Sequence, residues 1–343
     1  MTLLVTAVAR NHVFHASDQL VTYGHAGLVV EHDRRANKTI VIVGSDCWLV
    51  LGYTGVAYLD GRPTDQFIAE AVSGVADLSH GGVLMRGRGQ SLWIHFEEIG
   101  RRIVESVDAA FRRLPPAAQK HKLILIGSGL QFTKPTWRHI IFQVEFNKKK
   151  WDSVGDPGRR PSWNSFALNV AGDVHKPIIK RARERIKAEG AESPERMRSI
   201  MVDAVRETGA ASKLVGENVI SVILAPEQSE IGIYFHLSDI GPAIEPPSAD
   251  PDRILPPPAV YTPFVLLPSA VHCPSIASGG VSRADGLALI FHGPSSTVGG
   301  GFVHSYDREP QPGVRRGRPK RAVAAIREVG SAWTRRCTCW RRG

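Results

Sequence analysis

The order of the expected secondary-structure elements constrains the fold of this 343-residue chain more than any other feature. Apolar runs and helical spacing predict strands, two helices, strands, two helices and strands, in that order. No strand–helix–strand alternation appears, so the pattern argues against a doubly wound parallel sheet. We therefore expect an α+β fold in which antiparallel sheets pack between layers of helices.

The expected strands are short apolar or β-prone runs, several of them bounded by turn signals. They cover residues 3–8, 13–17, 39–43, 48–51, 123–126, 137–146, 166–170, 218–224 and 231–236, with 286–291 as a further candidate.

Four helices are expected between these strands. The first starts near residues 63–65, and the second extends from a Ser91 cap to Leu114, where two prolines stop it. The second pair covers residues 174–188 and a stretch from a Ser193 cap, with proline at the first helical position, to about Thr208.

Composition divides the chain into three parts. Residues 1–240 contain nearly all the expected elements, whereas 241–307 are rich in Pro and Gly and predict a linker or a segment draped over the surface. Residues 308–343 predict an irregular, disordered basic tail. The tail holds 11 of the 43 Lys and Arg and 2 of the 33 Asp and Glu, so the rest of the chain is nearly neutral.

Cysteine usage and hydropathy indicate a cytoplasmic protein. Cys47, Cys273, Cys337 and Cys339 lack the paired spacing of a metal site, so no metal and no cofactor is expected. A signal peptide has a basic region before its apolar run, and the N-terminus here has none. No run approaches the roughly 18–20 apolar residues of a membrane span, so no membrane partner is expected.

Thr2 is a candidate nucleophile because it follows Met1 and has a small side chain. Initiator methionine is generally removed before such residues, which would leave Thr2 with both a hydroxyl and a free α-amine. An N-terminal amine with a pKa of roughly 8 can take the hydroxyl proton at neutral pH.

The sequence around Thr2 resembles the proteasome β-type subunits, which are N-terminal-nucleophile (Ntn) hydrolases. An apolar strand follows Thr2, and Asp18 comes sixteen residues after it in an Ala-Ser-Asp context. Lys38 stands at the start of an apolar strand, and Gly55 lies in a stretch similar to the family's glycine turn. The resemblance ends at about residue 236.

This resemblance implies a four-layer αββα sandwich, with two antiparallel sheets between two pairs of helices. It also implies a homo-oligomeric threonine peptidase or amidohydrolase that cleaves a peptide or other amide substrate. Thr2 would attack the carbonyl, Lys38 would stabilise charge near its hydroxyl, and Asp18 would orient Lys38. The Gly55 amide would donate to the oxyanion, and water would then hydrolyse the acyl-enzyme.

The chain departs from the family pattern at three places. Lys38 follows Thr2 at a longer interval than in the family, which requires a loop insertion around residues 26–35. Ala171 stands near the position of a supporting serine and has no hydroxyl. For the family's second supporting aspartate, Glu207 and Ser212 are the candidates. Ala171 and the missing second aspartate favour the alternative of a catalytically inactive Ntn-fold scaffold or assembly subunit.

Each candidate also has a purely structural interpretation. Asp18 can cap or turn the end of a strand, and Gly55 suits any tight turn. Lys38 lies close to two arginines in sequence and can be one more solvated charge.

Two further patterns are expected to be structural. His12, His15 and His25 match no metal motif and are expected on the surface or in loops. The stretch 126–130 lacks the full Gly-x-Ser-x-Gly elbow of a serine nucleophile and predicts a turn that ends a strand.

The tail supports a third hypothesis, a DNA-associated protein. Residues 315–321 resemble an AT-hook, whose Arg-Gly-Arg-Pro core enters the narrow minor groove of A·T-rich DNA, where negative potential is concentrated. The DNA contacts would come from Arg316, Gly317, Arg318, Pro319 and Lys320.

Overall fold

The computed structural model describes most of the chain up to residue 236 and four short segments beyond it. The described residues are 2–9, 12–25, 28–34, 36–78, 82–85, 94–133, 136–146, 152–156, 166–190, 193–236, 263–268, 270–273, 285–292 and 303–308. The tail residues with expected DNA contacts, Arg316, Gly317, Arg318, Pro319 and Lys320, lie outside these ranges.

A seven-stranded antiparallel sheet contains both ends of the described chain. Its strands, in spatial order, are β13 (Ala167–Gly172), β1 (Leu3–Ala9), β2 (His12–Asp18), β14 (Val219–Ala225), β15 (Glu230–His236), β18 (Asp285–His292) and β19 (Val303–Arg308). The predicted strands at 3–8, 13–17, 166–170, 218–224, 231–236 and 286–291 are confirmed here.

An eight-stranded sheet contains the middle of the chain. Its spatial order is β12 (Asp152–Asp156), β11 (Thr136–Phe146), β10 (Leu123–Thr133), β6 (Cys47–Thr54), β5 (Thr39–Val43), β16 (Phe264–Leu266), β17 (Ala270–Cys273) and β9 (Gly82–Met85). One pairing differs from the antiparallel expectation, because β16 lies parallel to β5, with Phe264 opposite Ile40. A two-stranded unit of β7 (Tyr58–Leu59) and β8 (Arg62–Pro63) precedes the first helix.

The four helices are α1 (Thr64–Ser73), α2 (Phe96–Arg113), α3 (Lys176–Arg185) and α4 (Pro194–Ala211). Short 3₁₀ turns cover 118–120 and 226–228, and a π-helical turn, 186–190, follows α3. The predicted cap of α4 is confirmed, because the Ser193 hydroxyl accepts the Arg196 amide at 3.1 Å. The predicted Ser91 cap of α2 is wrong. That helix begins at Phe96, whose amide donates to the Asp46 carboxylate at 2.9 Å.

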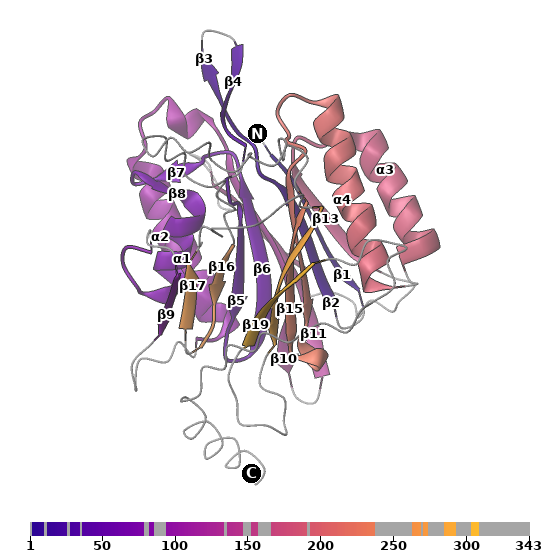
Figure 1. Ribbon diagram of the computed structural model, residues 1–343. Coiled ribbons are helices and arrows are strands. Elements are labelled where there is room, and N and C mark those ends of the chain that lie inside the picture. The colour runs from indigo at the N-terminus through magenta and orange to yellow at the C-terminus, as the bar shows by residue number, and fades with distance from the viewer. Residues whose placement is uncertain are drawn as a thin grey trace, which may run out of the picture.

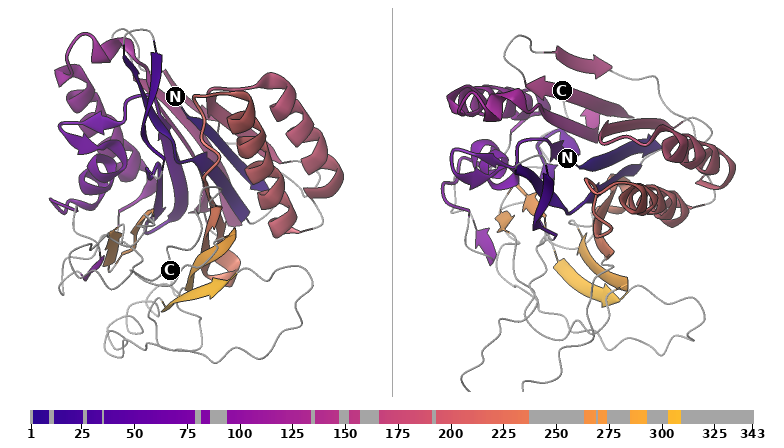
Figure 2. Two further views of the ribbon diagram at one scale, coloured as in Figure 1. Left: turned by 45° about the horizontal axis from the view of Figure 1, so that its top comes forward. Right: turned by 90° about the horizontal axis from the view of Figure 1, so that it is seen from above.

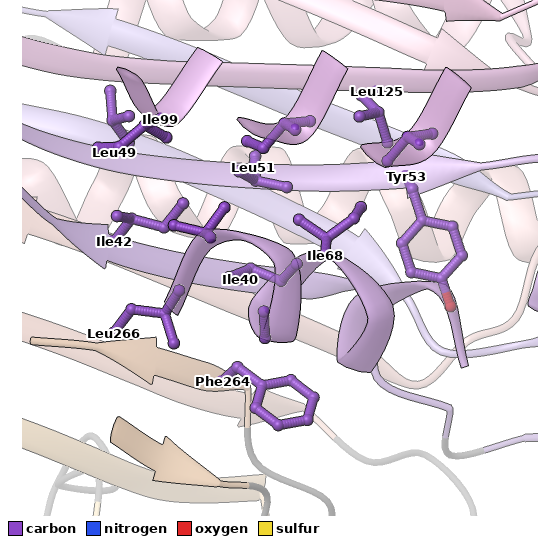
Figure 3. Close-up of a cluster of buried hydrophobic side chains, with 14 of the residues drawn as sticks. Ile40, Ile42, Leu49, Leu51, Tyr53, Ile68, Ile99, Leu125, Phe264 and Leu266 are labelled. Carbon is purple, nitrogen blue, oxygen red and sulfur yellow. The ribbon is translucent and has the colours of Figure 1, made fainter. Parts of the chain in front are cut away.

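Each helix pair packs against a different sheet, and Figures 1 and 2 show the two pairs on opposite sides of the molecule. On one side, Ile68 of α1 and Ile99 of α2 lie among Leu49, Leu51 and Phe264 of the eight-stranded sheet (Figure 3). Each such fully buried aliphatic side chain contributes about 1.5–3 kcal/mol to stability. On the other side, α3 and α4 bury apolar side chains against β1, β2 and β14.

A third apolar cluster, which includes Val13 and Val50, lies between the two sheets. Pairs of hydroxyl groups also connect one sheet to the other. The Ser17 and Thr39 hydroxyls hydrogen-bond at 2.8 Å, and the Thr6 and Ser128 hydroxyls also contact each other. Ser128 lies within β10, so the turn expected at 126–130 is wrong. Its hydroxyl is completely buried and already bonded, which suits a structural role.

The Pro- and Gly-rich part of the chain adds strands to both sheets. β16 and β17 extend the eight-stranded sheet, and β18 and β19 extend the seven-stranded one. Only β18 was predicted, because β16 and β17 are three and four residues long and most positions of β19 are polar or charged. No helix in the described ranges is long and apolar enough to cross a membrane.

The loop insertion expected around residues 26–35 takes the form of a two-stranded ribbon, β3 (Val21–His25) and β4 (Leu28–Asp33). Figure 1 shows the ribbon extending beyond the ends of the two sheets. Two hydrogen bonds fix its base. The Asn218 side-chain amide donates to the Arg34 carbonyl at 3.1 Å, and the Ala36 main-chain amide donates to the Gln19 carbonyl at 3.0 Å.

His15 lies between the two sheets, so its expected place on the surface or in a loop is wrong. It is 1% exposed, and within the described residues neither of its ring nitrogens has a hydrogen-bond partner. Burial lowers the pKa of its imidazole from 6.5 to about 3. The folded protein therefore holds His15 neutral at pH values where the unfolded chain binds a proton.

We expect His15 to make the fold acid-sensitive. The stability gained from keeping this ring neutral is fully present above pH 6.5 and is lost as the pH falls from 6.5 towards 3. Between pH 7 and pH 5 the loss from this one group is about 2 kcal/mol. Urea unfolding of His15→Leu should show a correspondingly smaller pH dependence than wild type. Leu51→Ala, at a buried apolar side chain, is the control: it should lower stability at every pH and keep the wild-type pH dependence.

Candidate active site

Thr2, Lys38 and Asp18 form one hydrogen-bonded cluster. The Lys38 ammonium donates to the Thr2 hydroxyl and, at 3.2 Å, to the Asp18 carboxylate. All three side chains are buried, with Thr2 3% exposed and Asp18 fully enclosed. The fold therefore brings together three of the four residues that the resemblance singled out.

Asp18 is fixed at the end of β2 by main-chain amides from three separate segments. Its carboxylate accepts from the amide of Leu3 at 2.9 Å, of Leu20 at 3.0 Å and of Gly216 at 3.1 Å. These bonds stabilise the charged carboxylate at a position that is fully buried. Asp18 thus does more than turn the end of its strand, because it also pairs with Lys38.

Lys38 is a buried amine immediately before β5. Its side chain is 3% exposed, so the interpretation of Lys38 as a solvated charge is wrong. It also donates to the Leu20 carbonyl. Burial lowers the pKa of its amine, and the nearby Asp18 carboxylate partly offsets that effect. The chain therefore carries a cation of reduced basicity in contact with the Thr2 hydroxyl.

Gly55 occupies a tight turn after β6. Its φ is +103°, and a Cβ at this position would lie 1.7 Å from the Lys122 carbonyl oxygen. Only glycine fits such a backbone. Among the described residues, no recorded hydrogen bond joins Gly55 to Thr2, Asp18 or Lys38. Its role as an oxyanion donor stays a prediction, and the geometry accounts for the glycine by the turn alone.

A second polar pair lies beside Thr2. The Asp173 amide donates to the Thr2 carbonyl at 2.8 Å, and the Asp173 carboxylate accepts the Ser212 hydroxyl at 2.6 Å. Of the two residues considered for the family's second aspartate, Ser212 therefore lies near Thr2. Glu207 pairs with Arg181 in an exposed ion pair on the helices.

Asp173 was missed by the sequence analysis. It is two positions after Ala171, where a supporting hydroxyl was sought, and its side chain is acidic instead. An acidic residue close to Ala171 can be seen in the sequence, but only the fold pairs Asp173 with a serine 39 residues away.

A cavity of about 750 Å³ adjoins this cluster on the side of α4. Its lining includes Leu20, Ser212 and Gly216, each of which bonds to a member of the cluster or to Asp173. Glu31 and Arg34, at the base of the ribbon, line it as well and pair with each other at 2.5 Å. The volume falls within the range of about 300–1,000 Å³ that is usual for ligand-binding cavities.

In the described part of the chain, no group of three or more His, Cys, Asp or Glu side chains is placed to hold a metal ion. Cys47 and Cys273 are buried free thiols. Burial raises the pKa of the Cys47 thiol, which keeps it protonated and unreactive at neutral pH.

No protein-family model and no curated protein matches this sequence. Among solved structures, Anbu (ancestral beta-subunit) from Yersinia bercovieri is similar, with 15% identity and a TM-score of 0.43 over 69% of this chain and 88% of that chain. Eukaryotic HslV from Trypanosoma brucei is similar at 13% identity and a TM-score of 0.37, over 65% of this chain and 99% of that chain. Similarity at this level does not bear on the chemistry at Thr2.

Proposed function

We propose that this protein is a proteasome-like Ntn hydrolase, a four-layer αββα sandwich that cleaves peptide or other amide bonds with Thr2 as its nucleophile. The observation that carries the proposal is the hydrogen bond from the buried Lys38 amine to the Thr2 hydroxyl, with Asp18 behind it. A threonine hydroxyl that only served packing would not need a buried cation.

The first chemical step forms an ester on Thr2. Once Met1 has been removed, the Thr2 oxygen attacks the amide carbon and its proton passes to the Thr2 α-amine. Lys38 stabilises the negative charge that develops at the attacking oxygen, and the Gly55 amide donates to the oxyanion, as the family resemblance implies. Collapse of the tetrahedral adduct breaks the C–N bond, and the α-ammonium protonates the departing amine.

The second step regenerates the enzyme. The α-amine takes a proton from water, the resulting hydroxide attacks the ester carbon, and the Thr2 oxygen leaves and recovers its proton. Asp18 holds Lys38 in place through both steps because its carboxylate is fixed by three amides. The protein acts in the cytoplasm as a homo-oligomer in this proposal.

Two measurements test the proposal together. Intact mass of the purified protein should correspond to a chain without Met1, and a β-lactone electrophile directed at threonine should add one equivalent, mapped to Thr2. Retained Met1 removes the free amine and contradicts the mechanism. So does an adduct at any other residue, or no adduct on a chain that lacks Met1.

An inactive scaffold is the second candidate, and Ala171 favours it because it has no hydroxyl near the position of the family's supporting serine. The scaffold predicts large assemblies in sedimentation together with complete absence of β-lactone labelling. The hydrolase predicts labelling whatever the size of the assembly, so β-lactone labelling separates the candidates.

In this proposal the cavity beside α4 receives part of the substrate, and we expect filling it to weaken substrate binding. Ala211→Trp places a large side chain at the cavity wall. KM for a peptide substrate should rise about tenfold or more, while a small β-lactone should still acylate Thr2 at close to the wild-type rate. Ala188→Trp, at an exposed position after α3, is the matched control. An unchanged KM in Ala211→Trp would place substrate binding elsewhere.

A further inference from the structure

Asn37 and Asp65 form a buried polar pair behind Lys38 that the reaction above does not use. Asp65 lies in the first turn of α1, and its carboxylate accepts the Asn37 side-chain amide at 2.8 Å. Asp65 is 4% exposed and Asn37 is 7% exposed. The pair therefore joins α1 to the residue immediately before Lys38.

The Asn37 side chain both donates to and accepts from the main chain of Thr39, the residue after Lys38. Its amide nitrogen donates to the Thr39 carbonyl at 3.1 Å, and its amide oxygen accepts from the Thr39 N–H at 3.2 Å. Tyr53 holds the same segment from β6, since its hydroxyl donates to the Asn37 carbonyl and its amide to the Lys38 carbonyl, each at 3.3 Å. The main chain on both sides of Lys38 is thus fixed by side-chain contacts.

Asp65 is an unusual group to bury at this place. Among the described residues no Lys or Arg contacts it, and Asn37 is its recorded side-chain partner. Burial raises the pKa of its carboxyl from 3.8 to about 7. A buried carboxyl without a cation reduces stability, and an apolar side chain would pack here at lower cost. The main-chain amides of Asp65 and Gln66 also bind this carboxylate at the start of α1, and the Asn37 amide is the contact that links it to the Lys38 segment.

We propose that Asn37 and Asp65 are positioning residues for Lys38. Asp65 fixes the orientation of the Asn37 amide, and Asn37 fixes the backbone of Lys38, so that the ammonium reaches the Thr2 hydroxyl and Asp18 together. The inference rests on the proposed function, since it concerns the rate at which Thr2 reacts. Neither residue touches the reacting atoms.

The test measures acylation of Thr2 by a β-lactone in the full-length protein, followed by intact mass at several concentrations. Asn37→Ala and Asp65→Ala should lower the maximal rate about tenfold or more, with the half-saturating concentration unchanged. Asp65→Asn keeps an acceptor for the Asn37 amide and should restore most of the rate. A wild-type rate in Asp65→Ala would overturn the inference.

Glu70→Ala is the matched control, because Glu70 is a buried acid of the same helix. Its carboxylate accepts from the Leu78 amide at 2.9 Å, from Gln66 at 2.8 Å and from Arg62, and among the described residues it has no recorded bond to the Lys38 segment. Glu70→Ala should lower the melting temperature and leave the acylation rate unchanged. The rates are compared at a temperature where all variants are folded. If acylation in Glu70→Ala is slowed as much as in Asp65→Ala, the Asp65 effect is general destabilisation and the positioning role is contradicted.

A crystal structure of Asp65→Ala separates failure of this inference from failure of the proposed function. If wild type is not labelled at all, the hydrolase proposal falls, but the positioning inference still predicts that Lys38 loses its contact with Thr2 or with Asp18 in the variant. Unchanged Lys38 contacts would overturn the positioning role, whatever the outcome of labelling.

Discussion

Thr2→Ala is expected to abolish amide hydrolysis while leaving the fold intact. Removing a covalent nucleophile lowers kcat by about 10⁴-fold or more, because neither the neighbouring cation nor the oxyanion donor can replace the missing bond. Within the described part of the chain the Thr2 hydroxyl makes one recorded hydrogen bond, from Lys38, so the free energy of unfolding should fall by only about 1–2 kcal/mol. Hydrolysis of a fluorogenic peptide and urea unfolding measure the two effects.

Two further variants sharpen this result. Thr2→Ser keeps the nucleophilic oxygen and should retain measurable hydrolysis. Thr208→Ala removes a buried threonine hydroxyl that donates to the Ala204 carbonyl of its own helix at 2.8 Å, and it should hydrolyse at the wild-type rate. Hydrolysis by Thr2→Ala at the wild-type rate would show that another residue supplies the nucleophile.

Lys38→Met is expected to damage both stability and activity. The substitution removes the only cation recorded beside Asp18 in the described structure and leaves that carboxylate completely buried. Breaking a buried pair from one side costs about 3–5 kcal/mol, and the three amides that still bind Asp18 should keep the loss near the lower value. The variant should also be inactive, since no cation remains next to the Thr2 hydroxyl.

The double variant Asp18→Asn/Lys38→Met separates these two effects. With no buried charge left unpaired, most of the lost stability should return, while hydrolysis should stay at background. Arg181→Met is the matched control, because it breaks the exposed pair with Glu207 and should change stability by no more than about 1 kcal/mol. A fully stable Lys38→Met single variant would mean that Asp18 does not need its cation.

The sequence was most informative where local patterns decide structure. The strands at 39–43 and 48–51 and the start of the last helix at Pro194 lie as predicted, because continuous apolar runs, turn residues and a serine cap act locally. The start of α2 was misplaced because its first amide is satisfied by Asp46, which lies 50 residues away in sequence. The parallel strand β16 was missed because three residues carry too little periodicity to register.

In the candidate site, too, some residues could be recognised in the sequence and others only in the fold. Thr2, Asp18 and Lys38 could be selected because their contexts resemble the proteasome β-type subunits, and the fold joins them by hydrogen bonds. Asp173 and Asp65 could not be selected, because each depends on a partner that only the tertiary fold supplies. The burial of Lys38 was likewise invisible, since neighbouring arginines in sequence suggested a solvated position.

The amides that bind Asp18 come from parts of the chain that are synthesised at different times. One of them belongs to Gly216, which is 198 residues later in the chain than the carboxylate it binds. During synthesis, a nascent chain that already contains Thr2, Asp18 and Lys38 still lacks this donor until most of the folded part has been translated. If Thr2 is the nucleophile, as we propose, its reactivity would then appear only near completion of the fold, which would spare the unfinished protein and its neighbours from premature cleavage.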